Sequence, residues 1–135
     1  MADERVEFEL VTPERLVVSR GVDMVVVPGA EGDFGVLPRH TPMISTVRPG
    51  VVRVYEGGKV SEEMFVAGGF AEVTLARCTV LADHALPVER LDRAAAEQKL
   101  KNAREDRADA STDDERREAE KQIAVCEEIL RITGA

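Results

Sequence analysis

The sequence has few of the residues that form covalent cross-links or bind transition metals. Its 135 residues include two cysteines, Cys78 and Cys126, two histidines, His40 and His84, and no tryptophan. The cysteines lie far apart with no second ligand pair near either, which favours reduced thiols in a cytosol over a disulfide framework or a zinc site. We expect both cysteines to fill hydrophobic cores, and we expect no bound metal or cofactor.

Long apolar segments are missing as well. No run approaches the roughly 20 residues that a membrane-spanning helix needs. The start of the chain, Met1-Ala2-Asp3-Glu4, has the wrong charge for a signal or transit peptide. The formal net charge of −8 disfavours nucleic acid and anionic lipid as partners. We therefore expect one ordinary domain, or a small domain with an appendage, in a bacterial cytoplasm.

Motifs of the common catalytic sites are also missing. The sequence contains no Gly-x-Ser-x-Gly nucleophile turn and no closely spaced pair of histidines or cysteines. The Gly-Gly-Lys sequence at 57–59 is followed by Val60 rather than Ser or Thr, so it predicts a turn and not a phosphate-binding loop. We expect no catalytic residues. A small acid/base enzyme that uses His40 with Asp33 is an alternative from another functional class.

Glycine and proline divide the chain into two parts. Nine of the ten glycines lie within residues 1–86 and all six prolines lie within residues 1–87. Charged side chains are more frequent in the part that follows. We expect a β domain over residues 1–86 and a helical appendage over residues 87–135.

The first part has short apolar segments separated by turn residues, which is typical of an all-β sandwich or barrel. Val6, Phe8 and Leu10 alternate with polar residues, so one face of this strand is expected in a core and the other in water. The Gly-Gly pair at 57–58 predicts a tight hairpin turn, and residues 22–27 are expected to be buried on both faces. Further strands are expected at residues 24–27, 42–47, 52–55, 59–67, 70–76 and 79–83, in a mostly antiparallel sheet.

The second part has the composition of helices, with no glycine or proline between Val88 and Thr133. Residues 112–115 fit a capping box, so we expect two antiparallel helices with a break at residues 108–114. One apolar stripe on the second helix consists of Ala119, Ile123, Cys126 and Leu130.

This helical hairpin has few apolar residues for its length. Eight Val, Leu or Ile residues lie between Val88 and Ile132. The free energy gained by burying these side chains is small compared with the backbone entropy that is lost when the segment becomes ordered. We therefore expect the hairpin to be marginally stable alone, to pack against another surface, and to move.

Residues 28–42 are unusually dense in turn residues, with three prolines and three glycines in fifteen positions. This composition predicts an irregular loop. Such a loop is either a binding edge at the end of the sandwich or a sandwich corner with bends, and the pattern alone favours neither.

Several motifs resemble the epsilon subunit family of bacterial F-type ATP synthases. Residues 32–42 match the family pattern Gly-x-x-Gly-x-x-Pro-Gly-His-x-Pro, except that Arg39 stands where the family has glycine, the residue type with the widest range of backbone angles. The resemblance covers the whole chain, and its other matching segments are residues 11–14, 48–50, 68–73 and 80–83.

The resemblance implies a β-sandwich of about ten strands followed by an antiparallel two-helix hairpin. It also implies a non-catalytic subunit of the rotating central stalk, peripheral to the cytoplasmic face of the bacterial inner membrane. Family members bind the gamma subunit along a face of the sandwich and the membrane ring of c subunits with its lower edge. Carried onto this sequence, the ring contact consists of Glu31, Asp33, Phe34, Leu37, Pro38, Arg39 and His40.

The family's helical tail can reach the alpha and beta subunits and restrain ATP hydrolysis through basic residues. The corresponding residues here are Arg116, Arg117, Lys121 and Arg131. Acidic residues outnumber them on the same helix, so strong electrostatic inhibition is not expected.

Some family members bind ATP through an aliphatic-Asp-x-x-Arg-Ala motif at the start of the first helix. Leu91, Asp92 and Ala96 match this motif, but Ala95 replaces its arginine. Arg93 lies two residues early, about 200° around the helix. We expect weak or absent ATP binding, with a free-standing nucleotide-sensing regulatory module as the alternative function.

Overall fold

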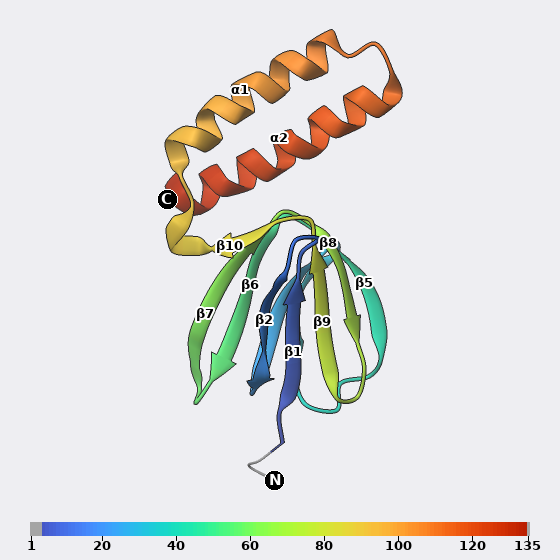
Figure 1. Cartoon of the computed structure of the whole chain (residues 1–135), viewed down its shortest axis with the longest axis vertical. Helices are drawn as coiled ribbons and strands as arrows, with labels where there is room; N and C mark the ends of the chain where they lie inside the picture. The colour runs from blue at the N-terminus through green and yellow to red at the C-terminus, as the bar shows by residue number, and fades with distance from the viewer. Residues whose placement is uncertain (1–3, 135) are drawn as a thin grey trace. The chain divides into compact units, whose positions relative to one another are not determined.

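The computed structural model describes residues 4–134 and divides them into two compact units, with the division between Glu89 and Arg90. The first unit is built from ten strands and the second from two helices (Figure 1). The expected fold class, a ten-stranded all-β domain followed by a helical hairpin, is confirmed.

The strands of the first unit are hydrogen-bonded into one ten-stranded sheet. They are β1 (Val6–Val11), β2 (Leu16–Val22), β3 (Met24–Gly29), β4 (Gly32–Val36), β5 (Met43–Val47), β6 (Gly50–Glu56), β7 (Lys59–Val66), β8 (Gly69–Val73), β9 (Arg77–Ala82) and β10 (Ala85–Pro87). Neighbours follow the order β10-β7-β6-β3-β5-β8-β9-β1-β2, and β4 pairs with β3. The pairs are antiparallel except β1 with β9, so the expectation of a mostly antiparallel sheet is confirmed.

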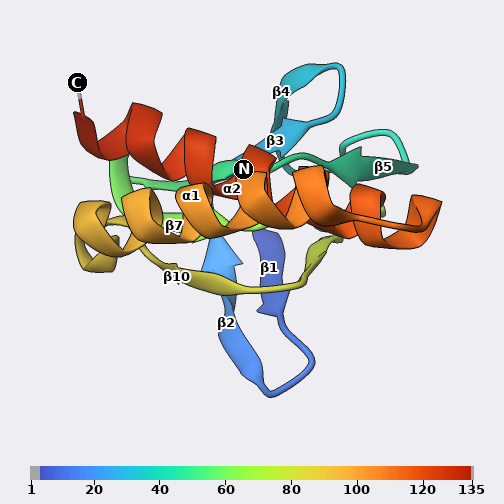
Figure 2. The ribbon, with the colours of Figure 1, turned by 90° about the horizontal axis from the view of Figure 1, so that it is seen from above.

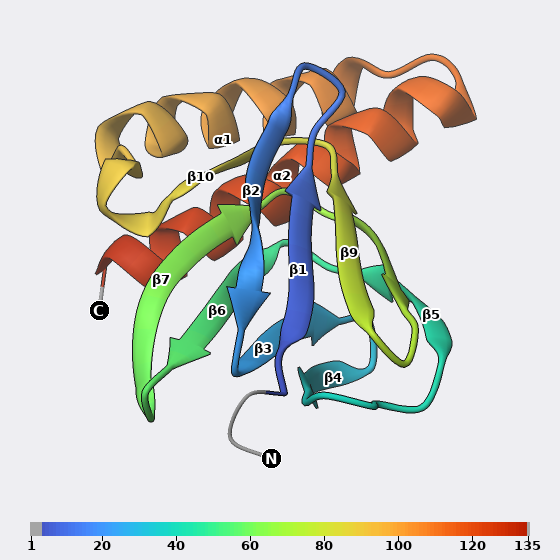
Figure 3. The same cartoon turned by 60° about the horizontal axis from the view of Figure 1, so that its bottom comes forward.

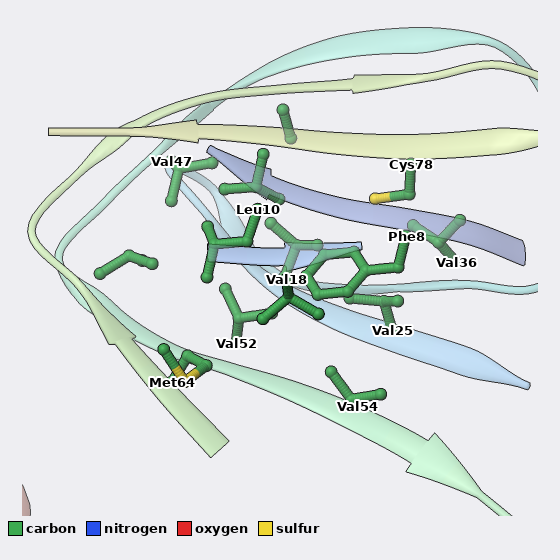
Figure 4. Close-up of a cluster of buried hydrophobic side chains, with 14 of the residues drawn as sticks. Phe8, Leu10, Val18, Val25, Val36, Val47, Val52, Val54, Met64 and Cys78 are labelled. Atoms are coloured by element: carbon green, nitrogen blue, oxygen red, sulfur yellow. The ribbon is translucent and has the colours of Figure 1, made fainter. Parts of the chain in front are cut away.

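The sheet folds into two layers, and at the corner between them Gly29 of β3 pairs with Val47 of β5. Figure 3 shows β1 between β2 and β9 in the layer nearer the viewer, with β3 and β6 behind them. Figure 4 shows Phe8 and Leu10 from β1 in one cluster with Val25 and Val52 from the other layer. This cluster is the core of the first unit.

Ion pairs connect β2 to the β6–β7 hairpin. The Arg20 guanidinium donates hydrogen bonds to Glu56 and Glu62, each at 3.0 Å. The Ser61 hydroxyl also donates to Glu56, and these bonds from Ser61 and Arg20 lower the pKa of the Glu56 carboxyl. The turn of this hairpin is the expected Gly-Gly pair at 57–58, with φ angles of 63° and 78°.

Two expectations for the first unit are wrong. Residues 32–36 are not part of an irregular loop, because they form β4, which pairs with β3 along its whole length. Residues 22–27 are not buried on both faces: Met24 and Val26 are partly exposed, while Val25 and Val27 are buried. Alternation therefore persists in β3, because a strand of a two-layer sandwich has only one core-facing side.

The second unit consists of α1 (Arg93–Asp109) and α2 (Asp113–Gly134), and a short 3-10 turn (Val88–Arg90) precedes them. The two helices run antiparallel and side by side (Figure 2). A small apolar cluster lies between them and consists of Leu100, Ala103, Ile123 and Cys126, with Leu130 against it. The predicted stripe on α2 is therefore confirmed. In residues 4–134, neither helix is both long enough and apolar enough to span a membrane.

Candidate functional site

The β3–β4 hairpin carries the two acids of the expected ring contact. Gly29 pairs with Gly32 at the end of its ladder, and the turn between them consists of Ala30 and Glu31. A side chain at Gly29 would lie 2.8 Å from the Gly32 carbonyl oxygen, so the turn requires glycine at this position. Gly32 has a φ of 140°, which also favours glycine. The glycines that suggest a loop thus allow the two strands to close tightly.

Arg48 connects this hairpin to the segment between β5 and β6. Its guanidinium donates one hydrogen bond to the Gly29 carbonyl and another to the Asp33 carboxylate, the latter at 2.6 Å. The backbone amide of Arg48 donates to the Pro28 carbonyl at 3.0 Å, and the Ala30 amide donates to the Thr46 carbonyl at 2.9 Å. The hairpin turn is therefore fixed by an ion pair and by hydrogen bonds to Arg48 and Thr46, which lie outside the hairpin.

Four of the other expected ring-contact residues, Leu37 to His40, form a separate turn. The His40 amide donates to the Leu37 carbonyl at 3.2 Å, with Pro38 second and Arg39 third in the turn. Arg39 has a φ of 65°. Proline at the second position and a positive φ at the third are features of a type II turn, which favours glycine at the third position. This geometry explains why the family pattern has Pro-Gly here.

The turn at 37–40 lies beside the β8–β9 connection. The Arg39 amide donates to the Leu75 carbonyl at 3.0 Å, and the Arg39 guanidinium lies 2.9 Å from a carboxylate oxygen of Glu4. Leu37 and Leu75 are exposed, with 56% and 61% of their surface accessible. Two leucines therefore face solvent at this end of the strands.

The seven residues expected to contact the ring do not form a single surface patch. Glu31 and Asp33 lie at the beginning of β4, whereas residues 37–40 follow its end. Phe34 lies between them and packs against the core cluster, so its ring is only partly exposed. These residues therefore form two patches along β4, joined by a strand.

His40 and Asp33 do not form an acid/base pair. The His40 Nδ1 lies 2.6 Å from the Thr41 carbonyl oxygen, which can only accept, so Nδ1 carries the proton. The Asp33 carboxylate bonds Arg48 instead. Within residues 4–134 no hydrogen bond or ion pair joins these two side chains. The geometry gives no support to the alternative acid/base enzyme.

A row of apolar side chains crosses the outer face of the layer made by β5, β8, β9, β1 and β2. Thr46 pairs with Phe70, Phe70 with Leu81, Leu81 with Val11, and Val11 with Leu16. Phe70, Leu81 and Leu16 have 58%, 52% and 53% of their surface exposed, and Ile44 on β5 has 74%. We call Leu16, Ile44, Phe70 and Leu81 the outer apolar row. Exposed large apolar residues gathered on one face are typical of a protein interaction surface.

Sequence reasoning missed the outer apolar row. A usable signal exists in β8 and β9, since Phe70 and Leu81 occupy positions that should be polar when Ala71 and Val80 face the core. These residues are seen to form one surface only when the register of the five strands is known. That register depends on pairings between segments up to 70 residues apart, such as Thr79 with Glu9.

The nucleotide-motif residues at the start of α1 are engaged within the helical unit. The Asp92 carboxylate caps α1 by accepting a hydrogen bond from the Ala95 amide at 3.0 Å. Arg93 donates to the Leu130 carbonyl at 3.3 Å and lies 3.4 Å from Glu97. Ala96 is buried, whereas Leu91 is partly exposed. Ala95 occupies the position at which the motif has arginine.

The three arginines of α2 are paired with acids of the same helix. Arg116 bonds Asp113 at 2.8 Å, and Arg117 bonds Asp114 at 2.6 Å. Arg131 donates to Glu128, and Lys121 also has an interaction partner. The charges of the expected regulatory residues are thus largely compensated within the helix.

The cysteines are both free and buried, one in each unit. Burial raises the pKa of the Cys78 thiol from 9.0 to about 12. Burial also raises the pKa of Cys126. Both thiols therefore fill cores, as expected, and in residues 4–134 no three His, Cys, Asp or Glu side chains are grouped to hold a metal ion.

Solved structures share this fold. A chain of the mitochondrial ATP synthase of Euglena gracilis, solved as OSCP/F1/c-ring in rotational state 1, is similar with a TM-score of 0.77 and 24% identity, over 97% of this chain and 82% of that one. A chain of the Tetrahymena thermophila mitochondrial ATP synthase central stalk and c-ring gives a TM-score of 0.73 and 14% identity, over 96% and 97%.

Family models and relatives extend the similarity to sequence. The β-sandwich domain of the ATP synthase delta/epsilon chain matches residues 5–88, and the C-terminal domain of the ATP synthase epsilon chain matches residues 92–135. The ATP synthase epsilon chain of Rhodospirillum rubrum is 53% identical over 127 residues, 94% of this chain and 95% of that protein. That of Paramagnetospirillum magneticum is 55% identical over 124 residues, 92% and 93%. With both of its units matched, the chain belongs to the ATP synthase epsilon chain family.

Proposed function

We propose that this chain is a non-catalytic rotor subunit that couples rotation of a proton-driven membrane ring to ATP synthesis. The observation that carries the proposal is the 53% identity to an ATP synthase epsilon chain over 94% of the sequence. The solved relatives support it, since one is a central stalk with its c-ring. The subunit acts peripherally at the cytoplasmic face of a bacterial inner membrane, and its partners are gamma, the c-ring, and alpha and beta through the hairpin.

The outer apolar row is the proposed face for the gamma subunit. Burying a large apolar side chain contributes about 2 kcal/mol, and the row offers several such side chains on a rigid layer of paired strands. A rigid surface loses little conformational entropy on binding, which favours a permanent contact that transmits torque.

The β3–β4 hairpin and the turn at 37–40 are the proposed contacts with the c-ring. The hairpin exposes acidic side chains, and the turn exposes Leu37 beside Arg39 and His40. Acids on a braced hairpin suit basic residues on the ring's polar loops, while the type II turn holds its side chains without freedom to reorganise.

The helical hairpin is proposed as a weak regulator of ATP hydrolysis. Arg116, Arg117 and Arg131 are each paired within α2, so little net positive charge is available for an acidic loop of alpha or beta. The Asp92 cap and the alanine at position 95 support weak or absent ATP binding.

Reconstitution of a depleted ATP synthase tests the proposal. Membrane vesicles whose synthase has been stripped of its epsilon chain are mixed with the purified full chain, and ATP-driven proton uptake is measured. We expect the wild-type chain to restore uptake and a Phe70→Ser/Leu81→Ser chain to require at least about tenfold more protein, since two buried apolar contacts are lost.

The matched control is Val60→Ser, which changes an exposed apolar residue on β7 outside the row. This variant should behave as wild type. Failure of the wild-type chain to restore proton uptake would overturn the proposed function. Equal restoration by all three chains would show that gamma does not bind the outer apolar row.

A further inference from the structure

The two acids of the β3–β4 hairpin differ in their surroundings. The Asp33 carboxylate forms an ion pair with Arg48, with 2.6 Å between Oδ1 and Nη2. Glu31 lies in the exposed turn, and among the residues that the structure describes its carboxylate has no hydrogen bond or ion pair. The two negative charges are therefore not equivalent toward a partner.

One guanidinium holds both strands of this hairpin. Nη1 of Arg48 donates to the Gly29 carbonyl on β3, and Nη2 donates to Asp33 on β4. Gly29 pairs with Gly32, and Pro28 pairs with Asp33, so the two bonds span the last two residue pairs before the turn. A planar guanidinium can donate in two directions at once, which the point charge of a lysine does poorly. We call Arg48 and Asp33 the hairpin brace.

The brace acts where the hairpin has little other support. Among the described strands β4 pairs only with β3, and their ladder of five residue pairs contains three glycines. Glycine weakens a strand because it packs no side chain and loses the most backbone entropy. Without Arg48, the position of the turn would depend on backbone bonds such as that from Ala30 to Thr46.

We propose that Arg48 is a positioning residue that fixes the hairpin turn through Asp33, and that Glu31 is the acid of this hairpin that pairs with a basic residue of the ring. This inference rests on the ring contact proposed above. It assigns different roles to Glu31 and Asp33, which the family resemblance places together in the ring contact. Asp33 is compensated within the chain and orders the turn, whereas Glu31 supplies the uncompensated charge.

Hydrogen exchange of the full-length chain tests the brace without any partner. In Arg48→Ala and in Asp33→Asn, the Ala30 amide should exchange about tenfold faster than in wild type, because a charge-assisted bond that limits local opening is lost. Arg48→Lys should give faster exchange as well, although it keeps the charge. Glu31→Gln should leave exchange unchanged. Unchanged exchange at Ala30 in Arg48→Ala would overturn the brace.

Binding of the same full-length chains to purified c-ring in detergent tests the role of Glu31. Affinity is measured at low and at high salt. Glu31→Gln should weaken binding at low salt, with the difference from wild type shrinking at high salt, since an exposed charge pair is screened. Asp33→Asn should weaken binding by a similar factor at both salt concentrations, because disorder of the turn does not depend on screening.

The two failures are distinguishable. If the wild-type chain does not bind the ring, the proposed ring contact is wrong. If the wild-type chain binds but Glu31→Gln binds equally well at low salt, the ring contact stands and the role given to Glu31 is wrong. The role given to Glu31 is also wrong if Asp33→Asn, rather than Glu31→Gln, shows the salt-dependent loss.

Discussion

Arg39 is a residue in a conformation that suits glycine. Its φ of 65° lies in the left-handed region, which costs a residue with a Cβ about 1 kcal/mol or more. Surrounding bonds hold it there: its amide bonds Leu75, its neighbour His40 bonds Leu37, and its guanidinium pairs with Glu4. The strain is local, and the rest of the turn keeps the geometry that Pro38 sets.

A comparison of Arg39→Gly with Arg39→Ala isolates this strain. Both variants lose the ion pair to Glu4, but only the glycine relieves the backbone, so it should be more stable by about 1 kcal/mol. Urea unfolding can be followed by the fluorescence of Tyr55, the single tyrosine, which lies on β6 in a chain without tryptophan. Equal stability of the two variants would contradict the assigned turn geometry.

Cys78 gives a pH dependence whose sign follows from its burial. The pKa of its thiol is raised to about 12, so the folded unit keeps the proton that the unfolded chain loses near pH 9.0. Its contribution to stability is complete below the unfolded pKa and is lost as pH rises toward the folded pKa. Between about pH 8 and 10.5, wild type should lose about 2 kcal/mol more unfolding free energy than Cys78→Val.

The matched variant controls for every other group that titrates in this range. Cys78→Val keeps a small apolar side chain at a position with no exposed surface, so packing changes little. Urea unfolding at both pH values gives the two differences. Parallel losses in wild type and variant would mean that the thiol is not buried as described.

The start of α2 is stabilised by a reciprocal cap. The Thr112 hydroxyl accepts from the Glu115 amide at 3.1 Å, and the Glu115 carboxylate accepts from the amides of Ser111 and Thr112 at 2.9 and 3.2 Å. The amide and hydroxyl of Ser111, followed by Thr112, lower the pKa of the Glu115 carboxyl. The capping box predicted from four residues of sequence is thereby confirmed.

Acid should weaken this cap in wild type and not in Glu115→Gln. Because the pKa of Glu115 is lower in the fold than its ordinary value of 4.5, the stabilisation is present above that value and is lost as pH falls below it. Far-UV circular dichroism should show helix content falling on acidification more in wild type than in Glu115→Gln. Thr112→Ala should lower hairpin stability by about 1 kcal/mol at neutral pH. Identical acid profiles for wild type and Glu115→Gln would contradict this cap.

The parts of the fold that sequence could predict are those decided locally. The Gly-Gly turn at 57–58, the stripe through Ile123 and Cys126, and the cap at 112–115 each depend on residues near one another in the chain. β4 could not be predicted, because glycine and aspartate are depleted in strands and only the ladder with β3 orders them. In the hairpin brace, Arg48 bonds Asp33 and Gly29, which lie 15 and 19 positions earlier in the chain. No local sequence pattern predicts these contacts.

The strands have a hydrophobic core of their own. Among the described residues, the cluster around Phe8 and Leu10 draws on strands from β1 to β9, with Ala85 against it and no residue from either helix. The helices have a separate, smaller cluster. No helix residue contributes to the large core, and the marginal stability of the hairpin stays a prediction.

Removal of residues 90–135 from the subunit in an assembled synthase separates the roles of the two units. We expect coupling to be retained, because the outer apolar row and the hairpin brace lie in the first unit. We expect the rate of ATP hydrolysis to rise by less than about threefold, because paired surface charges contribute little to binding an acidic partner. The Arg116→Gln/Arg117→Gln/Lys121→Gln/Arg131→Gln subunit is the matched control and should show the same small rise. A rise of about tenfold or more in that control would mean that these basic residues leave their partners within the subunit to bind alpha or beta. The charge compensation would then describe only the subunit outside the complex.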